Sequence, residues 1–176
     1  KWSSIYTKNA PVMMKFIDLF FKYGEAKFSC YIFAKNDLEL KEYFKNNLYA
    51  AYESLAAMQV CANLGKNESV ILIMDDLDTP LGLRFERNIK RKINRNNKFK
   101  RNAAYGVCRM YSKGVELIQL TDLFLGAVCY DFKLSANLIQ GPGLAKTQVL
   151  EHIRKKAKAK TLATDMSSAT FGVWKF

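Results

Sequence analysis

The feature that most constrains this chain is a short apolar run that ends abruptly in acids. The run occupies residues 70–74 (Val-Ile-Leu-Ile-Met) and is followed at once by Asp75, Asp76 and Asp78. A β-branched run of this length predicts a core strand. Carboxylates at the end of a core strand repel one another and lose hydration, so they are costly unless a cation or strong hydrogen-bond donors lie among them.

These carboxylates have two interpretations. Mg²⁺ and Mn²⁺ prefer carboxylate oxygens, so Asp75, Asp76 and Asp78 are candidate ligands of a divalent cation. In the alternative, Asp78-Thr-Pro forms a turn, and Asp75 or Asp76 caps a loop without any metal. The spacing of the acids by itself slightly favours the turn.

Strands and helices are expected to alternate along the chain. The sequence predicts strands over residues 27–35, 69–74 and 104–110, and helices over about 11–24, 37–63, 83–97, 116–132 and 144–160. This alternation implies an α/β fold with crossover connections, in a single domain over residues 1–176. The tail from residue 160 to 176 is expected either to dock as an edge strand or to stay loose.

The charge balance points to polyanions. The 176 residues include 28 Lys and Arg against 16 Asp and Glu, for a net charge of +12. Such an excess favours nucleic acid as a partner, through attraction and counterion release. A solubilising charge or an affinity for anionic membranes is the alternative, but the excess is clustered. No apolar run approaches the roughly 20 residues that span a bilayer. The four cysteines are widely spaced and form no C-x-x-C pair, so we expect reduced thiols in a cytoplasmic protein.

The basic residues concentrate in one segment. Residues 84–101 carry nine Lys and Arg against a single acid, Glu86. Five of the basic residues recur at three- and four-residue steps, which places them on one helix face: Arg84, Arg87, Arg91, Arg95 and Lys98. Phe85, Ile89 and Ile93 form a narrow apolar stripe displaced from this face, by which the helix is expected to dock. The planar arginine fork binds two phosphate oxygens at once, so this face is a candidate nucleic-acid-binding surface. An ordinary solvated face is the alternative. A second basic patch, residues 154–160, is expected to extend this surface or to form a mobile tail.

A further acid, Asp122, interrupts an almost wholly apolar helix over residues 117–128. An unpaired carboxylate there would be costly, so we expect it to meet a cation, a hydrogen-bond donor or water. Gly126 follows one turn later and leaves room for another chain segment or a substrate. In the alternative interpretation, Asp122 lies in the first turn of the helix, with Thr121 as its cap.

The strand ending at Asp75, the basic helix after it and the segment Leu-Ile-Gln-Leu-Thr-Asp122-Leu-Phe-Leu-Gly-Ala-Val128 together resemble a bacterial and phage family, known as domain of unknown function 3800. Members typically carry a leucine-glutamine-leucine-alanine-aspartate-leucine helix that ends in glycine-alanine. The matching positions are Gln119, Leu120, Asp122, Leu123, Gly126 and Ala127. The resemblance covers nearly the whole chain and is most specific at the Asp122 helix.

The resemblance implies a ribonuclease-H-like fold, in which helices flank a mixed sheet and central acids bind a divalent metal. Asp75 and Asp122 are the positions that match the family's ligands. The chain departs from the family in two places. The opening strand that ends in Asp-Glu-Ser-Gly is absent ahead of Lys1, and Ala34 stands where members often have an aspartate, with Asp37 nearby. We therefore expect the fold to be incomplete at its N-terminus.

The leading hypothesis is a metal-dependent nuclease. Asp75 and Asp122 would be its catalytic acids, with Asp76 and Asp78 as further ligands of Mg²⁺ or Mn²⁺, which activates water for phosphodiester hydrolysis. Two alternatives stay open. One is a nucleic-acid-binding module without catalysis, in which the acids are structural. The other is an interaction protein of phage or host defence, whose basic face meets an acidic partner.

Overall fold

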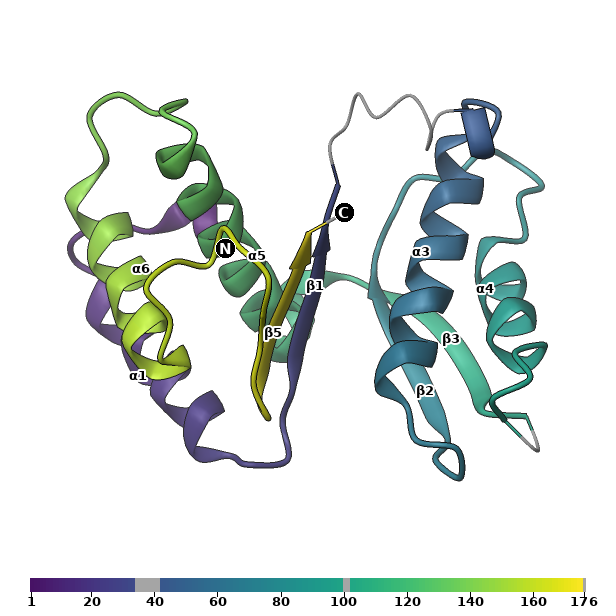
Figure 1. Cartoon of the computed structure of the whole chain (residues 1–176). Coiled ribbons are helices and arrows are strands. Elements are labelled where there is room, and N and C mark those ends of the chain that lie inside the picture. Colours follow the sequence, from purple (N-terminus) through teal and green to yellow (C-terminus); the bar gives the residue numbers. More distant parts are fainter. Residues whose placement is uncertain (34–41, 100–101, 176) are drawn as a thin grey trace. The chain divides into compact units, whose positions relative to one another are not determined.

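The computed structural model describes residues 1–33, 42–99 and 102–175 (Figure 1). Helices and strands alternate along these residues, so the α/β class that the sequence predicts is confirmed. The chain divides into two compact units, each described here by itself. The terminal unit combines Lys1–Ile32 with Glu116–Phe176, and the central unit is Phe33–Val115.

The terminal unit contains a three-stranded sheet in the order β1-β5-β4. Strand β1 (Phe28–Ile32) runs parallel to β5 (Phe171–Lys175), and the short β4 (Met166–Ser167) pairs with β5 in the antiparallel sense. The C-terminal segment therefore forms the central strand of this sheet. The tail was expected to be an edge strand or loose, and both expectations are wrong because β5 has hydrogen-bonded neighbours on each side.

Three helices pack with this sheet: α1 (Ala10–Lys22), α5 (Glu116–Ser135) and α6 (Leu144–Ala157). Their shared core is apolar and includes Ile17 of α1 and Ile153 of α6, both fully buried. Phe124 of α5 lies at its centre, with ring contacts to Phe28 and Phe171 at 5.1 and 5.3 Å between centroids. Burial of these large side chains provides the main stabilisation of the unit.

The central unit pairs two parallel strands, β2 (Val70–Asp75) and β3 (Ala104–Met110), with the helices α3 (Leu48–Asn63) and α4 (Phe85–Asn94). Figure 1 shows α3 and α4 beside this strand pair. The core of the unit is built mainly from α4, which buries Phe85, Ile89 and Ile93 almost completely. These are the residues of the apolar stripe that the sequence predicts for this helix.

Strand β2 is not the core strand that its composition predicts. Leu72 and Met74 face the helices, whereas Ile71 and Ile73 on the opposite face are 67% and 49% exposed. Helices of the central unit therefore cover only one face of the pair. An uninterrupted apolar run does not reveal this, because it lacks the polar alternation that marks a half-covered strand.

Helix α3 begins later than expected. It starts at Leu48, and the Asn47 side chain caps it by accepting a hydrogen bond from the Ala50 amide at 3.0 Å. Lys45 and Asn46 have φ angles of 51° and 58°, which place them in the left-handed region and interrupt the helix. The predicted start of this helix at about residue 37 lies outside the described residues. Within the described part of the chain, no helix is long and apolar enough to cross a bilayer.

Candidate nucleic-acid interface

Helix α4 has two chemically different sides. Its apolar side is held in the core of the central unit. Arg87 and Arg91 lie on its other side, and Arg84 and Arg95 flank the helix as its N-cap and C-cap residues. All four are exposed: Arg84, Arg87, Arg91 and Arg95. We call this set the arginine face. The helix thus presents a positive row to solvent from a buried and well-packed base.

The lysines of the same segment are used differently. Lys90 Nζ donates to the Tyr105 carbonyl of β3 at 2.7 Å, and Lys92 Nζ donates to Ser54 Oγ of α3 at 3.0 Å. Lys98 lies beyond the end of the helix, where its Nζ donates to the Cys61 carbonyl at 2.7 Å. These lysines therefore fasten α4 and the chain after it to neighbouring elements. Lys98, predicted with the arginines, is only partly exposed and does not belong to their row.

The arginine face lacks compensating acids. Among the described residues, the side chains of Arg84, Arg87 and Arg95 have no hydrogen-bond or ion-pair partner, and Arg91 has only a long contact of 3.5 Å to Asn88 Oδ1. Glu86, the one acid of α4, pairs instead with Arg109 of β3. The four guanidinium groups therefore keep their donors available for an external anion.

The acids after β2 do not have the environment that the sequence predicts. Asp75, Asp76 and Asp78 are all exposed, so they retain their hydration and need no cation to be tolerated. Asp75 Oδ1 accepts a hydrogen bond from the Asp76 amide at 3.0 Å, which matches the loop-capping alternative. Their exposure also leaves the carboxylates accessible to a hydrated ion.

A cation from within the chain lies near these acids. The Arg109 guanidinium donates to the Glu86 carboxylate, to the Leu77 carbonyl and, at 3.2 Å, to Thr79 Oγ1. Glu86 is the main cause of a raised Arg109 pKa, and the charges of Asp76 and Asp78 raise it further. Arg109 thus fixes the acidic loop through Leu77 and Thr79 and places a positive charge near Asp76 and Asp78.

The Asp122 carboxylate accepts a hydrogen bond from the backbone. Its Oδ2 accepts the backbone N–H of Trp2 at 2.9 Å, and Asp122 itself is exposed on α5. A Cβ on Gly126 would lie 2.2 Å from Trp2 side-chain atoms, so the glycine gives space to the indole. The expected approach of another chain segment at Gly126 is therefore confirmed. The alternative, a first-turn acid with Thr121 as cap, is wrong, because α5 begins six residues earlier at Glu116 and Thr121 Oγ1 donates to Leu117 within the helix.

Asp75 belongs to the central unit and Asp122 to the terminal unit. Their joint binding of Mg²⁺ or Mn²⁺ stays a prediction. Across the described ranges, no group of three or more His, Cys, Asp and Glu side chains is arranged to hold a metal ion.

Sequence reasoning missed Asp131 on α5, which is the most buried acid among the described residues and is fully buried. Its carboxylate accepts hydrogen bonds from Nε and Nη2 of Arg154, from the Thr161 hydroxyl and from the Leu162 amide. The signal was available, because Asp131 lies in the same apolar helix as Asp122 and a basic patch follows in the chain. Its role is to fasten α6 and the segment after it to α5.

Comparison of the chain with known protein families, with curated proteins and with solved structures finds no match in any of the three. The functional argument therefore depends on the chemistry of the described side chains.

Proposed function

We propose that the protein binds nucleic acid through the arginine face of α4. The observation that carries this proposal is that four exposed arginines lie in one row without an acidic partner among the described residues. Planar guanidinium groups pair with phosphate oxygens in bidentate fashion, so the row follows a nucleic-acid backbone without reading base sequence. The net charge of +12 supports the same class of partner.

The way α4 is held also supports this proposal. Its apolar side is buried, and Asn88 Nδ2 donates to Glu53 Oε1 of α3 at 2.7 Å, with Lys92 bonded to the same helix. The backbone of the helix is therefore fixed before any ligand arrives. Only side-chain ordering then opposes binding, which reduces its entropic cost.

Binding is tested with fluorescently labelled DNA and RNA by anisotropy at several salt concentrations. The charge-reversed protein Arg87→Glu/Arg91→Glu should lose most of its affinity, because two phosphate contacts become repulsive. The matched control is Lys8→Glu/Lys15→Glu, which reverses two exposed lysines of the terminal unit with the same change in net charge. Equal losses in both proteins would contradict the proposal, and no binding by wild type at low salt would favour an acidic protein partner.

A second candidate function is metal-dependent hydrolysis of nucleic-acid phosphodiesters. One observation favours it: three exposed carboxylates follow one another at the carboxyl end of a parallel strand. Their oxygens are the donors that Mg²⁺ or Mn²⁺ prefers, and a bound ion would supply an activated water. Asp75, Asp76 and Asp78 would hold the ion, and the arginine face would position the backbone. The ribonuclease-H-like fold that the family resemblance implies belongs to this candidate.

Hydrolysis is tested by incubating labelled DNA and RNA with the protein and Mg²⁺, Mn²⁺ or a chelator. Asp75→Asn should abolish cleavage while leaving binding intact, since it removes a charge without changing the shape of the side chain. Asp122→Asn, tested in parallel, decides whether the ligand implied by the resemblance takes part. Binding without cleavage under all metal conditions would exclude this candidate and leave the first.

A further inference from the structure

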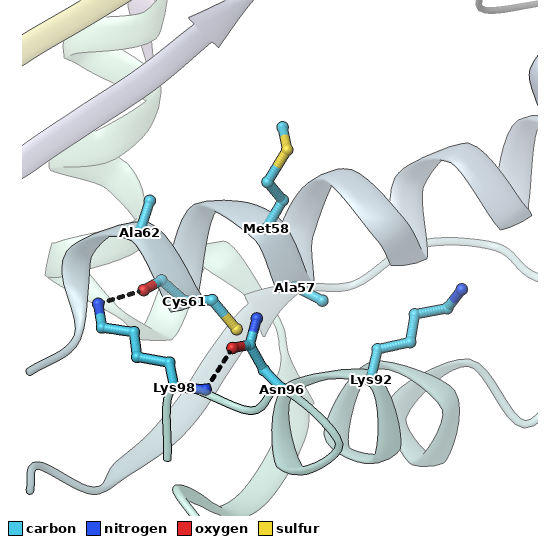
Figure 2. Close-up of a pocket in the computed structure, with 7 residues that line it drawn as sticks. All are labelled: Ala57, Met58, Cys61, Ala62, Lys92, Asn96 and Lys98. Atoms are coloured by element: carbon cyan, nitrogen blue, oxygen red, sulfur yellow. Dashed lines mark hydrogen bonds between the residues drawn. The ribbon is translucent and has the colours of Figure 1, made fainter. Parts of the chain in front are cut away.

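A hollow opens between the C-terminal ends of α3 and α4, next to the arginine face. It has a volume of about 460 Å³, which is in the range of pockets that hold small organic molecules. Figure 2 shows its two walls. The α3 wall is uncharged and consists of Ala57, Met58, Cys61 and Ala62, and the opposite wall carries Lys92, Asn96 and Lys98.

The α3 wall is neutral. Burial raises the pKa of the Cys61 thiol, while Lys98 and Asn96 lower it to a smaller extent, so the thiol keeps its proton at neutral pH. Ala57 is buried and Ala62 is exposed at the rim. Ala57, Cys61 and Ala62 have short side chains within about one and a half turns of α3. Met58 adds a longer apolar side chain, and a flat base can lie against such an apolar wall.

The opposite wall is positive and held in place. Each ammonium group uses one donor within the fold, Lys98 Nζ to the Cys61 carbonyl and Lys92 Nζ to Ser54 Oγ. A lysine has three donors, so both retain capacity for a ligand. Asn96 Oδ1 accepts the Lys98 amide at 2.9 Å, which orients its carboxamide toward the hollow (Figure 2). None of the described residues that line the hollow is an Asp or Glu, so the described lining does not repel an anionic group.

Residues that line the hollow directly follow residues of the arginine face in the chain. Lys92 follows Arg91 directly, and Asn96 follows Arg95. On α4, residue 92 lies about 100° around the helix from residue 91. A strand whose phosphates follow the arginines therefore passes the mouth of the hollow at the C-terminal end of the helix.

We propose that the hollow receives one unpaired nucleotide of a nucleic-acid strand, with its base against the α3 wall and its flanking phosphates on Lys92 and Lys98. This inference rests on the proposed binding of nucleic acid by α4, and it names the class of ligand. Bases of a duplex are stacked and paired inside the helix, so they do not enter a side pocket without disrupting the duplex. The protein therefore prefers single strands to duplexes.

The test compares labelled single strands with duplexes of equal length, by anisotropy at one fixed salt concentration. The single strand should bind about tenfold more tightly, which corresponds to about 1.4 kcal/mol of additional binding free energy. Ala62→Glu places a carboxylate at the exposed rim of the hollow and should remove this preference. The control Leu48→Glu adds the same charge at an exposed site on the opposite end of α3, and it should keep the preference.

The outcomes distinguish the nucleotide site from the proposed binding of nucleic acid by the arginine face, on which it rests. Equal wild-type affinity for single strand and duplex, or equal effects of Ala62→Glu and Leu48→Glu, would overturn the nucleotide site. The binding function would stand in that case if Arg87→Glu/Arg91→Glu still abolished binding. The wild-type comparison needs no variant, so it decides the question even where Ala62→Glu fails to fold.

Discussion

The two basic helices of this protein, α4 and α6, use their positive charge in opposite ways. On α6, Arg154 pairs with the fully buried Asp131 and with Glu151, and Lys156 pairs with Asp18 of α1. On α4, no acid reaches the arginine face from any described residue. Clusters of basic residues that look alike in the sequence thus stabilise the fold in one helix and remain available for a ligand in the other.

The second basic patch is divided between these two uses. The charges of Arg154 and Lys156 are paired within the terminal unit, and Lys158 ends α6 in the left-handed conformation, with φ of 55°. Part of the patch therefore has a structural role. That the exposed Lys155, Lys158 and Lys160 extend the nucleic-acid-binding surface stays a prediction.

The largest expected effect distinguishes the two helices by stability. Arg154→Ala leaves the buried Asp131 without its charge partner, so the free energy of unfolding should fall by about 3 kcal/mol. Arg91→Ala removes an exposed and uncompensated charge and should change it by less than about 0.5 kcal/mol. The free energy of unfolding of both variants is measured by urea denaturation. Similar losses of unfolding free energy in the two variants would contradict the view that Arg154 stabilises the fold and Arg91 does not.

The next effect distinguishes the helices by salt dependence. If four phosphates are neutralised at the arginine face, the logarithm of the affinity for duplex DNA should fall with the logarithm of salt concentration with a slope of about −3.6. Arg87→Ala should reduce the magnitude of this slope by about 1. Lys155→Ala, at an exposed position of α6, should leave it unchanged. A reduced slope in both variants would assign α6 to the interface as well.

Sequence reasoning succeeded where the signal was local. The spacing of Phe85, Ile89 and Ile93 against the arginines gave both sides of α4, because helix periodicity alone decides which residues share a side. It failed where the decisive partner was distant. Trp2 reaches Asp122 from 120 residues away, and Arg109 reaches Glu86 from 23.

The same limit applies to the acidic loop. The expected cation beside Asp75 followed from the assumption that β2 is a core strand, and the sequence does not say that only one face of β2 is covered within its unit. Once Asp75, Asp76 and Asp78 are exposed, their mutual repulsion is screened by water. Their chemistry still fits a metal ion, but their presence no longer requires one.

A third prediction concerns Asp122, which the family resemblance relates to metal binding and the structure to Trp2. Gly126→Ala would bring a methyl group into the indole, so it should displace Trp2 and lower the free energy of unfolding by about 1–3 kcal/mol. The displacement is followed by tryptophan fluorescence, with Trp174→Phe as the background that leaves Trp2 as the reporter. Gly114, where a Cβ meets nothing within 4 Å, provides the control Gly114→Ala. An unchanged emission spectrum in Gly126→Ala would contradict the packing of Trp2 on α5.

The smallest effect is a pH dependence at the contact between α1 and α6. Lys156 and then His152, whose Nε2 lies 3.0 Å from Asp18 Oδ1, lower the pKa of Asp18 below its usual 3.8. A lowered pKa means that the unfolded chain takes up the proton first, so this contact stabilises the fold above pH 3.8 and the contribution is lost as pH falls through the folded-state value. Asp18→Asn should therefore flatten the acid limb of a plot of melting temperature against pH. The effect should be small because the pair is solvated. A steeper acid limb in Asp18→Asn would mean that the carboxylate opposes this contact, and α6 would then differ less from α4 than its ion pairs indicate.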